Sequence, residues 1–299
     1  MDERGLLYPA RLPAFHRLLP PHELEDRVRW FWIPEWNLGA GVVSRQDILP
    51  FPALNLVIGP EGISLSGPAT RSSHRNLRGS GWAVGVLLRP AAVPAFTSDP
   101  GALRDAEVQY LAPDLHAAVL AAMGSETGEQ TGGGANDSHG NGNGNENENG
   151  NDDGGVARRA RAAAVVVSWL QTKIPVPVAE ARLANRLEDL IRTDSSLTRV
   201  DQAADRLGVS VRTLQRLARR HVGLPPLAMI RRYRLQEAAD RLRSDPGAVI
   251  ADVAADLGYA DHAHLAAAFR DVLGLPPSGY RRAADPGTGG APAAEQAEG

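Results

Sequence analysis

Two short segments of the chain repeat one another at an interval of 50 residues. Residues 200–208 have the sequence VDQAADRLG and residues 250–258 have the sequence IADVAADLG. Beyond these segments the interval becomes 51, and the GLPP of residues 223–226 recurs at 274–277. The C-terminal part of the chain is therefore restricted to folds that contain one small unit twice.

Each copy has the parts of a helix-turn-helix. Gly208 suits the left-handed end of a first helix, and Ser210 suits the N-cap of a second one. The apolar residues of both helices fall at helical spacing: Val200, Ala203, Ala204 and Leu207, then Leu214, Leu217 and Ala218. In the second copy Gly258 and Asp261 take the positions of turn and cap. A helix over 227–243 joins the copies.

The outward face of the second helix in each copy provides candidate DNA contacts. In the first copy these are Ser210, Val211, Arg212, Thr213, Gln215, Arg216, Arg219 and Arg220. In the second copy they are Asp261, His262, His264, Ala267 and Arg270. Arginine can fork onto a guanine edge and glutamine can bridge an adenine edge. A charged helix face is usually only solvated, but a duplicated, capped and basic unit favours DNA binding.

Charge is divided unevenly along the chain. Residues 1–155 hold 11 basic and 19 acidic side chains, whereas residues 156–283 hold 21 basic and 13 acidic ones. A basic half of this kind indicates a nucleic-acid-binding domain. Of the 32 basic residues only Lys173 is a lysine, and GC-rich coding explains that ratio better than a need for arginine does.

A low-complexity stretch separates the two halves. Residues 124–155 contain no Val, Ile, Leu, Met or aromatic residue, so they cannot bury enough apolar surface to offset the cost of ordering them. We expect a β-rich sensor or assembly domain, a disordered Gly/Asn-rich linker, a helical DNA-binding domain and a disordered tail, at residues 1–123, 124–155, 156–282 and 283–299. The helix-turn-helix units occupy about 199–222 and about 249–273.

The first half has the pattern of short strands. Aromatic and β-branched runs lie between Gly and Pro turns at residues 28–33, 54–58, 63–66 and 82–88. Residues 54–66 predict a hairpin, and helical patterns follow over 99–122. The predicted fold class is α+β with two domains: a barrel-like or sandwich-like β-rich N-terminal domain with helices, and an all-α C-terminal domain.

Two apolar features of the chain allow more than one interpretation. Trp30, Trp32 and Trp82 are candidate ligand contacts, although strand core is the commoner role of such side chains. Residues 158–172 carry an apolar stripe formed by Val165, Val166, Trp169 and Leu170. The stripe either packs on Leu183, Leu187 and Leu190 of the following helix, which we favour, or forms the contact of a homodimer.

Several classes of site lack their residues. Without cysteine there is no disulfide or thiolate metal site, and a cytoplasmic location is expected. His16, His22 and His74 do not have metal-ligand spacing. The chain has no phosphate loop, nucleophile elbow or dinucleotide fingerprint, so we expect no enzyme activity, cofactor or metal. No apolar run approaches the ~20 residues of a membrane span, and the N-terminus is not a secretory signal.

Four stretches carry a family resemblance: 203–217 (AADRLGVSVRTLQRL), 232–238 (RYRLQEA), 257–265 (LGYADHAHL) and 274–281 (GLPPSGYR). Together they resemble the two-unit DNA-binding domain of the AraC/XylS transcription regulators. The chain departs from that family at 266–268, three alanines where members usually carry a larger polar or basic residue. Residues 8–90 are similar to the β-rich, cupin-like domain of one branch, which implies effector binding or dimerisation.

The sequence therefore predicts a sequence-specific DNA-binding transcription regulator, either an activator or a repressor. The expected partners are double-stranded promoter or operator DNA, a small-molecule effector, RNA polymerase and a second copy of the chain, with no membrane. The alternative is a small-molecule-binding or enzymatic β-barrel whose helical domain mediates protein contacts. Nonspecific nucleoid binding is a third interpretation.

Overall fold

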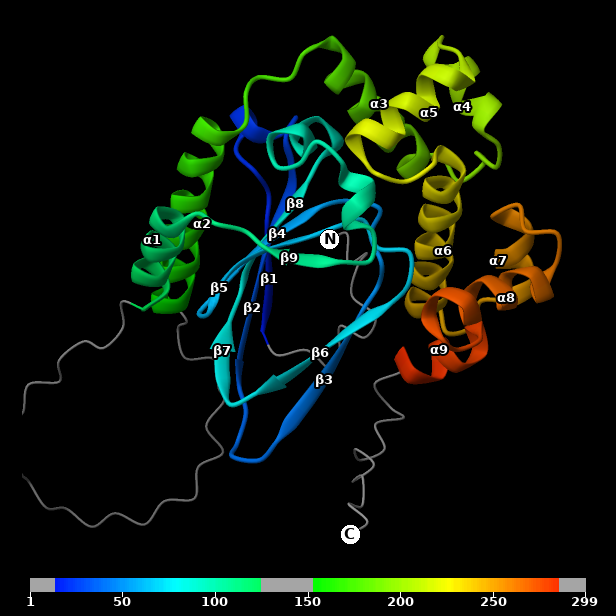
Figure 1. Ribbon diagram of the computed structural model, residues 1–299. Helices are drawn as coiled ribbons and strands as arrows, with labels where there is room; N and C mark the ends of the chain where they lie inside the picture. The colour runs from blue at the N-terminus through cyan, green and yellow to red at the C-terminus, as the bar shows by residue number, and fades with distance from the viewer. Residues whose placement is uncertain (1–13, 125–152, 285–299) are drawn as a thin grey trace, which may run out of the picture.

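The computed structural model describes residues 14–124 and 153–284, which form a β-rich part and a helical part (Figure 1). The strands are β1 (Phe15–Leu18), β2 (Val28–Asn37), β3 (Val43–Ile48), β4 (Asn55–Gly59), β5 (Gly62–Ser66), β6 (Ser73–Arg78), β7 (Ser80–Trp82), β8 (Val84–Leu88) and β9 (Glu107–Gln109). Seven form an antiparallel sheet in the order β1-β2-β8-β4-β5-β9, with β7 paired to β2. Strands β3 and β6 form a separate ribbon. The predicted α+β class is confirmed.

The β4–β5 hairpin was predicted and is confirmed. Ile58 pairs with Ile63 and Gly59 with Gly62, so the apolar residues of both strands point to one buried face. The β3–β6 ribbon was not predicted, because its strands lack the alternation of apolar and polar residues that marks a half-buried strand. Its strand β6 is exposed along almost its whole length.

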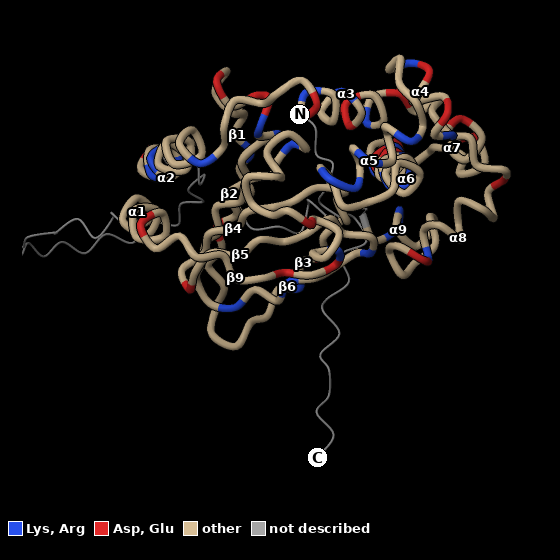
Figure 2. The backbone as a smooth tube through the Cα atoms, turned by 45° about the horizontal axis from the view of Figure 1, so that its top comes forward, with Lys and Arg blue, Asp and Glu red and all other residues tan. Residues whose placement is uncertain are grey.

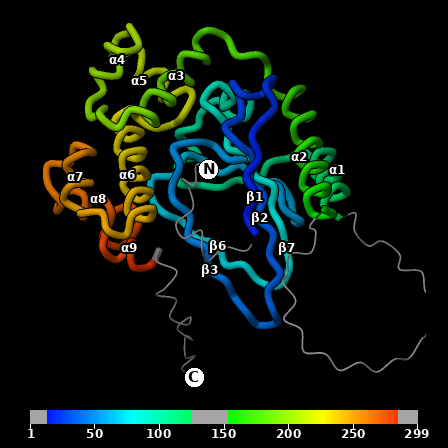
Figure 3. The backbone as a smooth tube through the Cα atoms, turned by 180° about the vertical axis from the view of Figure 1, so that it is seen from behind, coloured from blue at the N-terminus to red at the C-terminus, as the bar shows by residue number. Residues whose placement is uncertain are grey.

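Helices α1 (Pro113–Gly124) and α2 (Asp153–Lys173) lie side by side against the sheet (Figures 1 and 3). Val166 and Leu170 of α2 are fully buried in the same core as Phe31 and Ile33 of β2. The expected packing of this stripe on the following helix is therefore wrong. Because the stripe is covered within the chain, it gives no support to a homodimer. We propose a domain boundary in the 174–178 loop, after α2.

Seven further helices form the C-terminal part: α3 (Ala179–Thr193), α4 (Val200–Leu207), α5 (Val211–His221), α6 (Pro226–Ser244), α7 (Ile250–Asp256), α8 (His262–Leu273) and α9 (Pro277–Ala284). They build two separate cores. The first half of α6, including Met229 and Tyr233, packs with α3 to α5, and the second half, including Leu235 and Leu242, packs with α7 to α9. Helix α6 is thus the common element of both cores (Figure 3).

Short 3₁₀ helices connect the remaining elements: η2 (His22–Leu24), η3 (Pro90–Ala95) and η4 (Pro100–Leu103). The predicted linker 124–155 lies mostly outside the described residues; only Gly124, at the end of α1, and residues 153–155, at the start of α2, are described. The predicted tail lies outside them from residue 285 onward.

Candidate nucleic-acid interface

The first helix-turn-helix unit consists of α4 and α5. Gly208 ends α4 in the left-handed conformation, with φ of 65°, which a side chain with Cβ adopts only at a cost. The Oγ of Ser210 accepts a hydrogen bond from the backbone N–H of Thr213 at 3.1 Å. The predicted turn and cap of this unit are both confirmed. The local sequence therefore fixes where α5 begins and the direction in which it leaves the turn.

Packing of α5 determines which of its side chains face outward. Leu214, Leu217 and Ala218 are fully buried against Ala203 and Ala204 of α4 in the core of this unit. The two small alanines allow the helices to approach closely. The side chains left exposed are those of Arg212, Gln215, Arg216, Arg219 and Arg220. All five were predicted as DNA contacts, and one helix face presents them together.

Three of the predicted residues, at the start of α5, have structural roles within the first unit. Ser210 caps the helix, and the Oγ1 of Thr213 lies 2.9 Å from the Oγ of Ser210. Val211 is half-buried and packs against the core of the unit. These three residues position the start of α5, which leaves the arginines and Gln215 as the side chains able to reach a ligand.

The second helix-turn-helix unit consists of α7 and α8 and has the same plan. Gly258 has φ of 67°, and the Oδ1 of Asp261 accepts from the backbone N–H of His264 at 2.7 Å. Leu265 and Phe269 are fully buried on the inner face of α8. The exposed candidates are His262, His264, Ala267 and Arg270. The predicted cap of this unit is also confirmed.

His264 differs from an arginine of α5 in that it packs on its own unit. Its ring meets the ring of Tyr259 edge-on, with centroids 5.4 Å apart. The Tyr259 ring also contacts a cation, because the guanidinium of Arg234 lies over it, 4.5 Å from the ring centroid. Burial raises the pKa of Tyr259, against the opposing effect of Arg234, so this ring stays neutral at physiological pH.

The electrostatic surfaces of α5 and α8 are different. Arg220 pairs with Glu180 of α3 at 3.6 Å, whereas within the described parts of the chain Arg212, Arg216 and Arg219 have no ion pair. Helix α8 has one basic and one acidic residue, both toward its C-terminal end. Figure 2 shows this contrast, with charged residues gathered over α3 to α5 and a long uncharged stretch on α8. The positive potential therefore belongs mainly to the first unit.

A group of charged residues that sequence reasoning missed joins the first unit to the β-rich part. Arg29 of β2 donates to Glu188 at 2.6 Å and to Asp189 at 2.9 Å, and Arg89 pairs with Asp189. We call these four residues the charged seam. Glu188 also accepts from the hydroxyl of Tyr233 at 2.9 Å. No local pattern could have revealed the seam, because its partners are 100 to 160 residues apart.

Because the charged seam is buried, its members and Tyr233 strongly affect one another's pKa values. Glu188 is only 2% exposed and Tyr233 is 3% exposed. Burial and the Glu188 carboxylate raise the pKa of Tyr233 well above its ordinary value, so the hydroxyl keeps its proton and donates it to the hydrogen bond. Burial acts to lower the pKa of Arg29, but Glu188 and Asp189 outweigh it and raise that pKa. Each charge in the seam is held by its partner.

The three candidate tryptophans do not converge on one site. Trp30 and Trp32 belong to a small cluster on one face of the sheet, where Trp30 meets Phe51 edge-on and Trp32 stacks on Phe15. Trp82 packs instead against the main core. The Trp32 ring lies where a Cβ on Gly85 would be, so this glycine makes room for it. Phe51 and Phe15 thus cover part of Trp30 and Trp32, and Trp82 lies against a different core.

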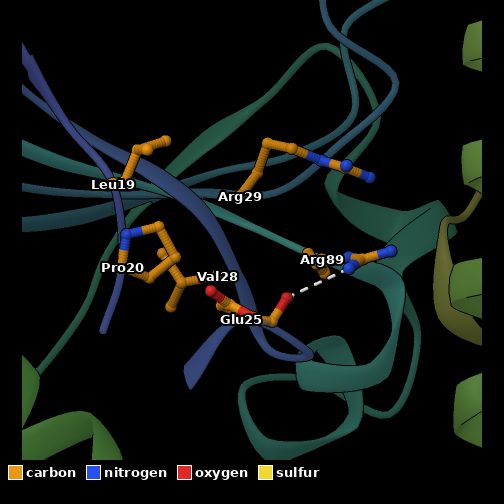
Figure 4. Close-up of a pocket in the computed structure, with 6 residues that line it drawn as sticks. All are labelled: Leu19, Pro20, Glu25, Val28, Arg29 and Arg89. Atoms are coloured by element: carbon orange, nitrogen blue, oxygen red, sulfur yellow. Dashed lines mark hydrogen bonds between the residues drawn. The ribbon is translucent and has the colours of Figure 1, made fainter. Parts of the chain in front are cut away.

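A small pocket lies beside the charged seam (Figure 4). Its volume is about 150 Å³, and its lining is formed by Leu19, Pro20, Glu25, Val28, Arg29 and Arg89. Arg89 donates to the backbone carbonyl of Glu25 at 3.0 Å across it. Among residues 14–124 and 153–284 no group of three or more His, Cys, Asp or Glu could hold a metal ion. None of the helices in these ranges is long and apolar enough to cross a bilayer.

Comparison with known families divides the chain as its structure does. A helix-turn-helix domain family matches residues 203–283, which contain both units except the first three residues of α4. A domain family of unknown function (DUF6597) matches residues 16–109, which contain all nine strands except one end residue of β1. The first match shows that the helical part contains a helix-turn-helix domain. The second match assigns no activity to the β-rich part.

Several regulators are similar to the helical part. An AraC-like transcription regulator of Streptomyces lividans is 34% identical over 122 residues, which are 41% of this chain and 38% of the relative. The transcriptional activator RhaS of Escherichia fergusonii is 37% identical over 82 residues, 27% of this chain and 29% of its own. The chain thus matches less than half the length of these relatives, and the relatives are named as transcription regulators.

Solved structures also align over both parts of the chain. ToxT from Vibrio cholerae, in a complex with (E)-4-(8-methylnaphthalen-1-yl)but-3-enoic acid, aligns with 85% of this chain and 99% of its own. The sequence identity is 11% and the TM-score is 0.43.

Proposed function

We propose, from the premise that this chain belongs through its helix-turn-helix domain to the AraC family, that it is a sequence-specific DNA-binding transcription regulator. In this proposal α5 lies in a major groove of the DNA. Arg212, Gln215 and Arg216 contact base edges, and Arg219 and Arg220 contact phosphates. No step of catalysis is part of the proposed function.

The observation that carries the proposal is the exposed face of α5. Three arginines on that face lack acidic partners in the described chain, while the inner face is fully packed. A merely solvated face usually mixes both signs, as α3 does with Glu180, Arg182 and Arg186. An uncompensated row of arginines on a capped, projecting helix fits a polyanion whose phosphates are regularly spaced.

The second unit has a different part in the proposed complex. Among its predicted contacts, Asp261 caps the helix, His262 and His264 offer imidazoles, and Ala267 offers a methyl group. Arg270 is the one arginine of this set. We propose that α8 enters the adjacent major groove and adds mainly apolar and phosphate contacts. The first unit then supplies most of the base discrimination.

The test is selection of binding sites from a random duplex library by the full chain. Recovered sites should share a motif, and binding measured by electrophoretic shift should fall steeply as salt rises. The double variant R212A/R216A should lose the preference for that motif over random competitor. The variant R45A is the matched control, because Arg45 is an exposed arginine of β3 paired with Asp47.

Two outcomes would overturn the proposal. Absent or salt-insensitive binding by the wild-type chain would favour the alternative in which the helical domain mediates protein contacts. Equal affinity for the selected motif and for random competitor would favour nonspecific nucleoid binding. An unchanged motif preference in R212A/R216A would show that α5 is not the base-reading helix.

We also propose that the β-rich part is the input domain and takes a small-molecule effector. The support is the aromatic cluster of Trp30 and Trp32 and the pocket beside Arg29 and Arg89 (Figure 4). Mass spectrometry of small molecules released from the denatured full chain tests this. A molecule that is lost from the Trp30→Phe variant supports the cluster, and one retained by it points to the pocket. Contact with RNA polymerase remains a prediction.

A further inference from the structure

The β-rich part holds the helical part at three places along its length. The first unit is attached by the charged seam and by Asn185, whose Oδ1 accepts from Ala91 N–H at 2.9 Å and whose Nδ2 donates to the Asp26 carbonyl at 2.6 Å. The end of α5 adds His221, which donates to the carbonyl of Pro90 at 3.0 Å. These contacts place α3 and α5 on β2 and η3.

The connecting helix α6 is attached near its middle. Gln236 is 1% exposed, and its Nε2 donates to the carbonyl of Pro50 at 2.7 Å. One turn earlier, Arg232 donates to the carbonyl of Thr70. Both acceptors belong to loops of the β-rich part that flank the β3–β6 ribbon. Because two loops contact one helix, α6 cannot rotate about its own axis without breaking both contacts.

The second unit is attached by apolar packing and by one main-chain hydrogen bond. Leu49 comes from the β-rich part, yet it is 2% exposed and lies in the core of the second unit, among residues such as Leu235 and Phe269. The N–H of Ser72 donates to the carbonyl of Val272, at the end of α8, at 2.8 Å. The β-rich part therefore completes the core of the second unit.

Between themselves the two units have little to fix their relative orientation. They share α6, whose 19 residues span about 28 Å. They also approach one another at Gly258, where an added Cβ would lie 2.8 Å from Thr198. Two helices that enter adjacent major grooves on one face of DNA must be about 34 Å apart and correctly rotated. A shared helix and the close approach at Gly258 restrain that geometry less than a domain that holds both units.

We propose that the β-rich domain sets the distance and angle between the two DNA-contacting helices, and so determines which half-site spacing the protein accepts. This inference rests on the proposed function. The three attachments leave the arginines and Gln215 of α5 exposed, and also Arg270 of α8, so the protein can keep these attachments while it binds DNA. Glu188, Gln236 and Leu49 then influence DNA specificity without touching DNA.

The experiment removes the charged seam, which is the ionic part of the first unit's attachment, with the triple variant R29M/R89M/E188Q in the full chain. The variant leaves no charged side chain buried without a partner, since residue 188 becomes neutral and Asp189 is 40% exposed. A glutamine at 188 still accepts from Tyr233. The matched control R45M/R75M/E107Q makes the same three changes of residue type at exposed ion-pairing positions of the β-rich part.

Binding is measured on a selected site and on the same site with 1, 2 or 5 added base pairs between the two half-sites. For the wild type and the control we expect affinity to fall by about tenfold or more when half a helical turn is added, because only one unit can then engage. The triple variant should lose less than about threefold, with unchanged affinity for a single half-site. Circular dichroism establishes that each variant is folded.

A folded triple variant with the spacing dependence of the wild type would overturn the inference. If the triple variant does not fold, Leu49→Ala is measured in its place, since it loosens the attachment of the second unit alone. A wild type that selects a motif but tolerates every spacing also refutes the inference that the β-rich domain sets the half-site spacing, while it leaves the proposed function intact. A wild type that selects no motif refutes the proposed function itself.

Discussion

The first helix-turn-helix unit exposes arginines on α5 and is attached to the β-rich part by buried ion pairs. The second exposes histidine and alanine on α8 and is attached through Leu49 and a main-chain hydrogen bond. Both units nevertheless have the same glycine turn and the same N-cap bond. Duplication thus kept the backbone plan, while the outer surface and the attachment of each copy diverged. The residues that make the fold and the residues that make contacts can be told apart by this comparison.

The largest effect is expected from Glu188→Ala, which leaves the hydroxyl of Tyr233 without its buried acceptor and the guanidinium of Arg29 with the half-exposed Asp189 alone. Removing one partner of a buried pair costs about 3–5 kcal/mol of unfolding free energy, because the other charge stays desolvated. Urea unfolding followed by circular dichroism measures it. Glu180→Ala is the control: its exposed pair with Arg220 should contribute less than about 1 kcal/mol. Equal losses for the two variants would mean that the seam carries no special weight.

The DNA-contacting faces should differ next. Arg216→Ala should cost ~1–3 kcal/mol in binding to the selected site if Arg216 forks onto a base. His264→Ala should cost less, because that ring packs on Tyr259. Competition electrophoretic shift at one fixed salt concentration gives both numbers. An equal or greater loss for His264→Ala would reverse the assignment of base reading to the first unit.

Local signals were sufficient for the two units. The spacing of Leu214 and Leu217, a glycine at each turn and Ser210 or Asp261 at each cap predicted two helices in each unit, and the structure has α4, α5, α7 and α8 there. Such signals work because neighbours in the sequence are also neighbours in a helix. The outward arginines of α5 follow from the same periodicity once its inner face is known.

What the sequence did not reveal depends on contacts between distant segments. Helix α2 was expected to pack on the next helix. Its apolar residues instead share a core with those of α1, which precedes it in the chain on the other side of the low-complexity stretch. The seam between Arg29 and Glu188 joins residues 159 apart, and neither residue stands out in its own segment. Leu49 belongs by sequence to the β-rich part and by packing to the second unit. Pairings of this kind are set by topology, which periodicity does not report.

A smaller effect is expected at the shared caps. Ser210→Ala and Asp261→Ala should each lower the unfolding free energy by about 1 kcal/mol, because each leaves a backbone N–H at a helix start without its acceptor. Thermal unfolding of the full chain measures this, and Asp261→Asn should retain most of the stability. The two losses should be similar, since in both units the cap side chain accepts from the backbone N–H three residues later. A loss confined to one unit would show that the two copies no longer share their turn.

The smallest expected difference is in the response to pH. His221, at the end of α5, is buried against the Pro90 carbonyl, and burial lowers its pKa, with Arg220 acting in the same direction and the Pro90 carbonyl and Glu180 opposing them. Below the ordinary histidine pKa of about 6.5 the unfolded chain gains a proton that the folded chain does not, so the unfolding free energy should fall as pH falls through the range below 6.5.

His221→Gln keeps a donor for Pro90 without that proton, so its unfolding free energy should fall less over the same range. His264→Gln, at an exposed position in the second unit, should follow the wild type. Urea unfolding of the three proteins between pH 7.5 and pH 5, a range of about one unit or more on each side of that pKa, decides the point, and parallel curves for wild type and His221→Gln would show that this contact does not sense pH.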